Sequence, residues 1–489
     1  MKLRVRLLRL RAGRPIAFLH NKDAQKLAAH SGDRIEIKDG SKPRIAIIDI
    51  ASGLFHEGEI ALSEEIAQEL NVHSKDYVEV TLAPIPKSAH ILQTKKSTKE
   101  YTKKDLKIIM KDIVNDVLSE AEIAYFVSGV YHYGMSLKET FYLTQAIYET
   151  GNRIKWRSRN VADKHSIGGI PGNRTTPIIV SICAAAGIIM PKTSSRAITS
   201  GAGTADAVES LARVDFSTKE LKSIVKKNGA CLAWGGSLGL APADDKLIRV
   251  EKILNLDPEP QLIASILSKK IAVGSKYVLI DIPYGHGAKV SHKGALRLKH
   301  KFEAIGKLLK LKVSVVLTDG SQPIGNGLGP VLEIKDVLRV LQRNSSPLDL
   351  ESKSVMLAGK LLEMVGKCKK GNGKKMAQQI LDSGAAFQKF RNIIKSQDGN
   401  AHNLPIAKFN HTYHATKSGT IKRIDNKDIN RVCRIAGCPQ DKPAGLYLYK
   451  HCGSRVRKGE PLVTLYAESE QKLKEALNYL KETDPIAVE

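Results

Sequence analysis

Residues 163–211 read DKHSIGGIPGNRTTPIIVSICAAAGIIMPKTSSRAITSGAGTADAVESL. This stretch contains two loops rich in glycine and hydroxyl side chains, over 164–176 and 193–204, and each loop leads into a predicted helix. The first helix is predicted to have Thr176 as its N-cap and Pro177 at its first helical position. Gly-rich loops that feed apolar helices are typical of an α/β fold, so these residues indicate the fold class of the central part of the chain.

The two loops have the chemistry of an anion site. The second ends at Thr204, before a helical run over 205–211. A helix N-terminus presents unpaired N–H groups and a partial positive charge. Glycines let a ligand approach the backbone, hydroxyls donate hydrogen bonds, and Lys164 and Arg196 add full charges. Two such loops predict a phosphate site, although for either loop alone ordinary turns between buried elements remain an alternative.

The length and apolar pattern indicate a large protein without membrane segments. A chain of 489 residues is expected to form two to four domains. No apolar run approaches the ~20 residues that span a bilayer. The N-terminal MKLRVRLLRLRAGRP lacks the uninterrupted apolar core of a signal peptide. We therefore expect a cytoplasmic protein with no membrane association.

The formal net charge of +27 favours anionic partners such as phosphate esters and nucleotides. The charge is spread along the chain, and its densest cluster, at 367–375, is predicted to be a solvated loop. Only 5% of the residues are aromatic, and no alternation of basic and aromatic residues predicts a base-stacking surface. Nucleic acid is thus an unlikely partner. The six cysteines fit no common zinc spacing, so no metal site is expected.

Changes in sequence pattern divide the chain into four parts. Residues 1–84 hold short alternating runs broken by turn residues, which predict a small β-barrel. A Pro- and Lys-rich linker and a helical pattern occupy 85–160. Over 161–405 helices alternate with buried strands, as in a mainly parallel α/β domain. The rest, 406–489, is β-rich with a final helix over 470–481 and is predicted to be an α+β domain, so the fold class is multidomain α/β.

Local signals place several elements within these parts. Ser136 three residues before Glu139 matches a capping box, as does the pattern at 217–220. The runs at 278–282 and 313–319 are predicted buried parallel strands, and ligands bind beyond the carboxyl ends of such strands. One apolar face predicts a helix from about residue 104; its members are Leu106, Ile109, Met110, Ile113 and Val117.

Four segments together carry a family resemblance. They are KHSIGG at 164–169, SSRAITSGAGTAD at 194–206, DGSQPIGNGLGP at 319–330 and LIASILSKK at 262–270. They resemble the thymidine phosphorylase family, and in particular its archaeal-type branch, the AMP phosphorylases. The resemblance covers essentially the whole chain, including the N-terminal barrel of that branch.

The resemblance implies an architecture and a reaction. A helical domain, to which 245–275 returns, and an α/β domain would form the catalytic cleft and close over the substrate. Inorganic phosphate would attack C1′ of a nucleoside or nucleotide, and a free base and a pentose 1-phosphate would form. Phosphate is the co-substrate, no cofactor or metal is implied, and a homo-oligomer, at least a dimer, is expected.

The resemblance also assigns roles to residues. The residues expected to hold phosphate are Lys164, Ser166, Thr176, Ser194 and Thr204. The residues expected to contact the nucleotide are Gly169, Ser195, Arg196, Ala197, Ile198, Thr199, Ser200 and Lys289. Ser265 and Lys269 would face the base. A solvated surface position is the alternative interpretation for Lys269 and Lys289.

Two residues are candidates for assisting the departure of the base. Asp257 matches the proton donor proposed for the AMP phosphorylases, and it would need burial or a nearby phosphate to stay protonated. Capping of a helix that starts at Pro258 is its alternative role. His165 could act at a pyrimidine carbonyl without a shifted pKa, or it could simply pack the loop.

One position departs from the thymidine phosphorylase pattern. Where those enzymes carry an arginine that reads the pyrimidine, this chain has Val250. Arg249 is adjacent, but on a helix its side chain points about 100° away. Loss of a bidentate donor weakens pyrimidine selection, so thymidine and a nucleoside monophosphate both remain open as substrates.

Two other classes of function remain as alternatives. A phosphoribosyltransferase of related fold would use similar loops, but it needs Mg²⁺ held by carboxylates, and Asp206 and Glu209 are predicted to lie on a helix. A basic nucleic-acid-binding protein would show steeply salt-dependent binding of oligonucleotides.

Overall fold

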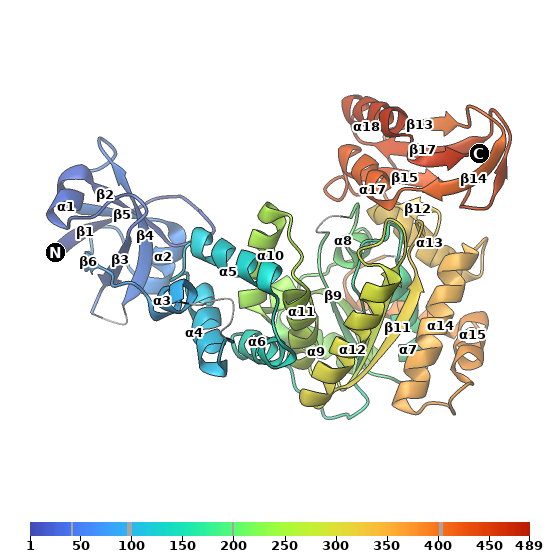
Figure 1. The fold of residues 1–489 in the computed structure, drawn as a ribbon, viewed down its shortest axis with the longest axis horizontal. Helices are drawn as coiled ribbons and strands as arrows, with labels where there is room; N and C mark the ends of the chain where they lie inside the picture. The colour runs from blue at the N-terminus through green and yellow to red at the C-terminus, as the bar shows by residue number, and fades with distance from the viewer. Residues whose placement is uncertain (41–42, 95–99, 198–199, 401–403) are drawn as a thin grey trace. The chain divides into compact units, whose positions relative to one another are not determined.

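The computed structural model describes residues 1–40, 43–94, 100–197, 200–400 and 404–489. The chain forms two compact units (Figure 1). The first consists of residues 1–150 with 242–261, and the second of residues 151–241 with 262–489. A segment from the middle of the chain thus returns to the N-terminal unit.

The N-terminal part of the first unit is a closed six-stranded barrel, as the sequence predicts. Its strand order is β1-β5-β2-β4-β3-β6. Alternate side chains point inward, so Leu3 and Val5 are buried while their neighbours are exposed. The strands are β1 (Lys2–Leu7), β2 (Ile16–His20), β3 (Arg34–Lys38), β4 (Arg44–Ala51), β5 (Glu59–Leu62) and β6 (Tyr77–Leu82). Two short helices accompany them, α1 (Asn21–Lys26) and α2 (Glu64–Leu70).

Helices complete the described part of the first unit. They are α3 (Lys87–Thr94), α4 (Lys103–Val114), α5 (Glu120–Tyr133), α6 (Leu137–Glu149) and α10 (Pro242–Leu254), and α10 packs on α5 and α4. The predicted capping box at the start of α6 is present: the Ser136 hydroxyl accepts from the Glu139 N–H, and the Glu139 carboxylate accepts from the Ser136 N–H. Val117 lies outside α4, because the chain leaves the helix at Asn115 and Asp116 adopts a positive φ of 54°.

The second unit is built on parallel strands. Strands β7 (Ala162–Ser166), β10 (Tyr277–Tyr284) and β11 (Lys312–Asp319) form one sheet in the order β11-β10-β7. A second parallel pair, β8 (Met190–Ser194) and β9 (Ala230–Trp234), adjoins β7 through a bridge between Val161 and Ile189. The predicted runs at 278–282 and 313–319 are therefore parallel strands.

Helices cover both faces of these strands. On one face Leu279 joins a core with α7 (Thr175–Ala185), α13 (Pro330–Gln342), α14 (Leu348–Val365), α15 (Gly373–Asp382) and α16 (Ala385–Ser396). On the other face Val278 and Ile280 pack against α11 (Glu259–Ala272) and α12 (His292–Leu308). This burial on both sides explains why the central strand β10 is apolar over 278–282 apart from Asp281. The capping box predicted at 217–220 is present at the start of α9 (Thr218–Asn228).

The start of α7 differs from the prediction. The helix begins at Thr175, its N-cap is Arg174, and Pro177 is its third residue. The Thr175 hydroxyl accepts a hydrogen bond from the buried Lys164 ammonium instead of capping the helix. Pro177 is tolerated there because N–H groups of the first turn have no partner within the helix.

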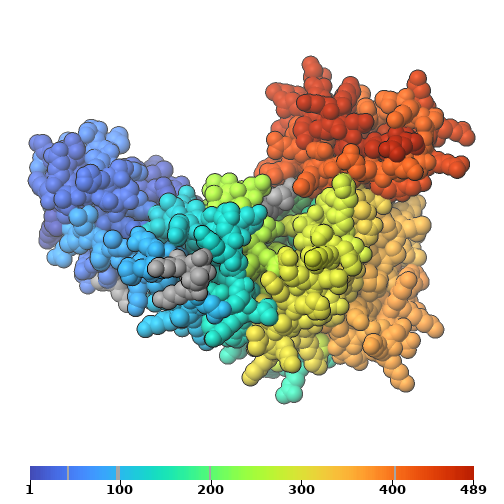
Figure 2. All heavy atoms as spheres, viewed as in Figure 1, coloured from blue at the N-terminus to red at the C-terminus, as the bar shows by residue number. Residues whose placement is uncertain are grey.

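The C-terminal part of the second unit has its own core, which also includes Leu328 of the preceding part. Strand β12 (Gly327–Leu328) pairs with β15, so the loop at 319–330 is joined directly to the C-terminal sheet, and the C-terminal residues lie against this part of the unit (Figure 2). Its elements are β13 (Phe409–His414), β14 (Gly419–Ile424), α17 (Asn426–Ile435), β15 (Gly445–Leu448), β16 (Arg455–Val456), β17 (Pro461–Ala467), α18 (Glu470–Thr483) and β18 (Ile486–Val488).

Among the described residues, none of the helices has the length and apolar character needed to cross a bilayer.

Candidate active site

The two Gly-rich loops lie at the carboxyl ends of adjacent parallel strands. The first loop follows β7 and leads into α7, and the second follows β8 and leads into α8 (Thr204–Glu209). The strands meet at the bridge between Val161 and Ile189. Both loops therefore sit at the edge of the sheet where α/β proteins bind ligands.

Arg174 joins the two loops directly. Its guanidinium donates to the Thr204 hydroxyl at 2.7 Å and to the Ala202 carbonyl at 2.9 Å. The same group forms a buried ion pair with Glu333 of α13 at 2.5 Å. Sequence reasoning missed Arg174. It stands next to two threonines at the end of a loop, and its partners lie 28 to 159 residues away in the chain.

Lys164 lies beneath the first loop and is 1% exposed. Its ammonium donates to the Thr175 hydroxyl at 2.8 Å and lies 3.7 Å from the Asp281 carboxylate of β10. Burial, together with the neighbouring charges of Lys353 and Arg174, lowers the pKa of Lys164 to about 8 against the opposing effect of Asp281. A buried ammonium close to the start of a helix is suited to attract an anion.

Hydroxyl groups line both loops. The Ser166 hydroxyl accepts from Asn173 at 3.3 Å. The Ser194 hydroxyl oxygen is shielded from solvent and has no hydrogen-bond partner among the described residues. The Thr204 hydroxyl accepts from Arg174, and its own proton remains available for donation. Thr176 is buried in the first turn of α7. The phosphate contacts of these residues stay predictions.

The second loop folds around the acidic residues of α8. The Asp206 carboxylate accepts from the N–H groups of Ala197 at 2.6 Å and Gly203 at 2.9 Å. Glycine is required at 203, because a Cβ there would lie 2.6 Å from the backbone of Arg196 and Ala197. Asp206 therefore ties the two described ends of this loop to the start of α8.

The charge of Arg196 is balanced within the protein. Its guanidinium forms two 2.6 Å hydrogen bonds with Glu209, lies 3.4 Å from Asp206 and 3.7 Å from Asp215, and stacks over Trp234. The hydrogen bonds from Arg196 lower the pKa of Glu209 to about 2. The sequence predicts Arg196 as a full positive charge at the anion site; in the structure carboxylates balance that charge, and the contact of Arg196 with a nucleotide stays a prediction.

Most of the remaining predicted nucleotide residues belong to the sequence of the two loops. A Cβ at Gly169, where φ is +92°, would lie 2.9 Å from Cγ of Lys289, so these two residues are in close contact. Ser195 is exposed, and the Ser200 hydroxyl donates to the Ala202 carbonyl at 2.9 Å. Ile198 and Thr199 lie outside the described residues. Ser265 and Lys269 lie one turn apart on α11, so they share a face of that helix.

His165 differs from its predicted chemistry. Burial lowers its pKa well below the usual value, and the nearby ammonium groups of Lys270 and Lys192 lower it further. The imidazole is therefore neutral near pH 7, and it can donate a hydrogen bond but not deliver a proton as an imidazolium. Asp257 is exposed immediately before α11, and it belongs to the first unit, whereas His165 belongs to the second.

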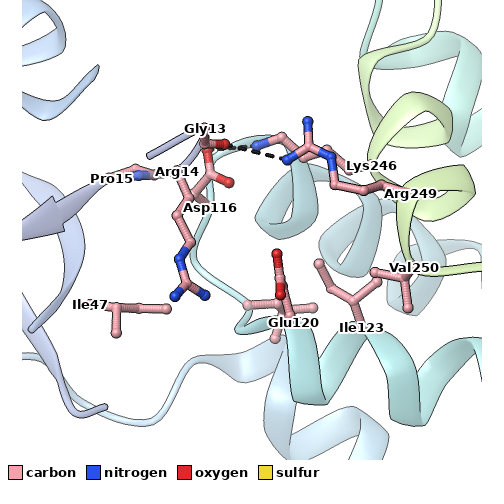
Figure 3. Close-up of a pocket in the computed structure, with 11 residues that line it drawn as sticks. Gly13, Arg14, Pro15, Ile47, Asp116, Glu120, Ile123, Lys246, Arg249 and Val250 are labelled. Atoms are coloured by element: carbon pink, nitrogen blue, oxygen red, sulfur yellow. Dashed lines mark hydrogen bonds and ion pairs between the residues drawn. The ribbon is translucent and has the colours of Figure 1, made fainter. Parts of the chain in front are cut away.

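Arg249 and Val250 lie on α10, as the sequence predicts. Val250 is 4% exposed. Arg249 lines a small pocket of the first unit, together with Arg14 and Glu120, and its guanidinium donates to the Gly13 carbonyl at 3.5 Å (Figure 3). Arg249 is thus bound to the barrel and does not take the place of the missing arginine.

The C-terminal part of the chain supports the second loop. The Asn430 side-chain oxygen accepts from the Gly201 N–H at 3.1 Å. The Lys442 ammonium lies 2.5 Å from the Glu209 carboxylate that binds Arg196. Lys442 lies outside the second loop, and through Glu209 it helps to hold Arg196 in place.

We expect Lys442→Met to weaken binding of substrate at the second loop. Loss of this half-buried ion pair loosens Glu209 and Arg196, and the expected rise in KM for phosphate is about two- to fivefold. Lys472→Met is the matched control, because its ammonium pairs with Asp441 at 2.8 Å in the same part of the chain. Equal KM values for both variants and the wild type would contradict this role.

Three family models match the chain. The "Glycosyl transferase family, helical bundle domain" matches residues 89–151, and the "Glycosyl transferase family, a/b domain" matches 158–387. The "Pyrimidine nucleoside phosphorylase C-terminal domain" matches 420–487.

Full-length relatives carry related names. An AMP phosphorylase of Thermococcus kodakarensis is 42% identical over 100% of this chain and 98% of its own length. A putative thymidine phosphorylase of Cupriavidus necator is 43% identical over 93% of this chain and 88% of its own length. Among solved structures, anthranilate phosphoribosyltransferase of Thermus thermophilus has a TM-score of 0.52 at 16% identity, over 64% of this chain and 99% of that one, which shows a shared fold. On its full-length identity to these relatives, the chain belongs to the thymidine phosphorylase and AMP phosphorylase family.

Proposed function

We propose that the protein is a pentosyltransferase that cleaves the N-glycosidic bond of a nucleoside 5′-monophosphate with inorganic phosphate, giving free base and a pentose 1-phosphate. The observation that carries the proposal is the junction of the two Gly-rich loops through Arg174, with the buried Lys164 beneath them. Phosphate is itself the nucleophile, so the protein's task is to position it and to stabilise charge in the transition state.

The resemblance gives each of the following residues a part in this chemistry. Lys164, Ser166, Ser194, Thr176 and Thr204 would hold the attacking phosphate. The neutral His165 would donate a hydrogen bond to the substrate. By resemblance, Asp257 would protonate the leaving base. Ser265 and Lys269 would contact the base from one face of α11, and the second loop with Lys289 would contact the nucleotide.

The choice of a nucleotide substrate rests on two observations. Val250 stands where the pyrimidine-reading arginine is expected, and the neighbouring Arg249 is bound to Gly13. The AMP phosphorylase relatives match the whole chain. Thymidine is the second candidate substrate, because relatives named putative thymidine phosphorylases are equally similar in sequence.

Release of free base from a substrate panel tests the proposal. AMP, CMP, UMP, thymidine, uridine and cytidine are each incubated with the protein, with and without phosphate. We expect phosphate-dependent release that is fastest with a 5′-monophosphate. Faster release from thymidine would show that the preferred substrate is the nucleoside. If no compound released its base in a phosphate-dependent way, the proposed reaction would be contradicted.

The lowered pKa of Lys164 predicts a pH dependence. The protonated amine is the form that attracts phosphate, and with a pKa of about 8 it loses its proton as the pH rises through that value. We expect KM for phosphate to rise as the pH increases from about 7 to about 9.5, and the lowered pKa of His165 predicts no step near its usual value of about 6.5. A KM that is constant over this range would contradict the role of Lys164.

We further propose that the protein works without a cofactor or metal, in the cytoplasm and as a homo-oligomer. No cofactor or metal is required, because the nucleophile is phosphate. The carboxylates of Asp206 and Glu209, which a Mg²⁺-dependent phosphoribosyltransferase would need, are engaged by the second loop. All six cysteines are free thiols, which suits the reducing cytoplasm. The resemblance favours a homo-oligomer, which light scattering on the purified protein would reveal.

A further inference from the structure

Lys353 is a buried cation that the reaction scheme above leaves without a role. It lies on α14, its side chain is 8% exposed, and its ammonium is 3.4 Å from the Asp281 carboxylate. Within the described parts of the chain this ammonium has no hydrogen-bond partner. Buried charges are normally both paired and hydrogen-bonded, so a buried ammonium with one long ion pair is costly and calls for a reason.

The charges beneath the two loops do not balance. Asp281 faces two ammonium groups, those of Lys164 at 3.7 Å and Lys353 at 3.4 Å. Asp163 is a second carboxylate that faces two ammonium groups, those of Lys192 at 3.1 Å and Lys270 at 2.8 Å. All four lysines and both aspartates are more than nine-tenths buried.

Neighbouring groups do not remove this excess. Arg174 is matched by Glu333, and the lowered pKa of His165 keeps that side chain neutral. Burial lowers the pKa of Lys164 to about 8 and that of Lys270 to about 7. In the state in which every lysine is protonated, four cations and two anions leave two surplus positive charges under the loops. Dianionic orthophosphate carries the complementary charge.

We propose that Lys353 is a positioning residue of the phosphate site, which shares the Asp281 carboxylate with Lys164 and so leaves the Lys164 ammonium free to attract orthophosphate. The inference rests on the proposed function and extends it to a residue of α14. Asp281 binds three other groups besides Lys353: Thr318 at 2.7 Å, Asn173 at 3.4 Å and Lys164. Lys353 is therefore not needed to hold Asp281 in place. The ammonium groups of Lys164 and Lys353 face the same Asp281 carboxylate at 3.7 Å and 3.4 Å, and the charge of Lys353 contributes to the lowered pKa of Lys164.

The experiment compares Lys353→Met with Lys360→Met, its matched control two turns along α14. Three quantities are measured: KM for phosphate, kcat, and the melting temperature with and without inorganic phosphate. We expect Lys353→Met to raise KM for phosphate about tenfold and to leave kcat within about twofold. A neighbouring charge changes a pKa by about one unit, which corresponds to about a tenfold change in an equilibrium constant. The melting temperature without phosphate should stay the same or rise, because an unsatisfied buried charge is removed.

The phosphate-induced rise in melting temperature should shrink in Lys353→Met and remain in Lys360→Met, and Lys353→Arg should restore most of the affinity. A fall in the melting temperature of phosphate-free Lys353→Met with an unchanged KM, or a variant that does not fold, would show a structural role and overturn the inference. The thermal shift with inorganic phosphate needs no turnover. If the wild type releases no base while this shift still depends on Lys353, the proposed reaction fails and the inference stands; if base is released and the shift is independent of Lys353, the reverse holds.

Discussion

Arg174→Met is expected to lower the free energy of unfolding by about 3–5 kcal/mol, because it leaves the Glu333 carboxylate buried without its partner. Glu333 is 2% exposed, and burial raises its pKa even with Arg174 beside it. The same substitution removes the bonds from Arg174 to Thr204 and Ala202 that join the loops. Urea denaturation measures the loss of stability, and KM for phosphate should rise in whatever fraction folds.

Two further variants make this prediction specific. Arg174→Met combined with Glu333→Gln should be less destabilised than the sum of the single variants, because the charge left alone is then removed. Arg213→Met is the matched control, since Arg213 and its partner Glu220 are both about half exposed, and its unfolding midpoint should match the wild type. An Arg174→Met protein within about 1 kcal/mol of the wild type would contradict the account of the junction.

Lys164→Met is expected to give the largest loss of activity. If the Lys164 ammonium holds phosphate next to the reacting carbon, its removal should lower kcat/KM for phosphate by about 10²–10³-fold, the range for loss of one buried stabilising group. The melting temperature should fall little, because Asp281 keeps Lys353 and Thr318 as partners. Steady-state kinetics at varied phosphate, with differential scanning calorimetry, measures both.

The control for Lys164→Met is Lys276→Met, which removes an exposed lysine directly before β10. It should leave kcat/KM unchanged. A Lys164→Met enzyme within about tenfold of the wild type would show that the attacking phosphate is bound elsewhere.

Local patterns in the sequence were sufficient for much of the fold. Capping boxes join residues three apart, so Ser136 with Glu139 could be read directly. Alternation over 1–84 predicted the barrel, and continuous apolar runs predicted the parallel strands β10 and β11. The predicted start of α7 was wrong by two residues: Thr176 is the second residue of the helix, and Arg174 occupies the N-cap position without a side-chain capping bond.

The charge balance of the site could not be predicted, because it depends on partners far apart in the chain. Arg174 meets Glu333, and Lys353 meets Asp281, only after the parallel strands and the helices around them have assembled. For the same reason it could not be predicted that burial and the charge of Lys270 keep His165 neutral. The ion pair between Arg196 and Glu209 was also missed, although the two residues are only 13 positions apart. It forms because Glu209 lies on α8, which follows the loop that contains Arg196.

A crystal structure with inorganic phosphate tests the central claim most directly. We expect the ion between the two loops, within hydrogen-bond distance of the Lys164 ammonium and of the hydroxyl groups of Ser166, Ser194 and Thr204. An ion bound at another place on the protein, with both loops unchanged, would contradict the claim.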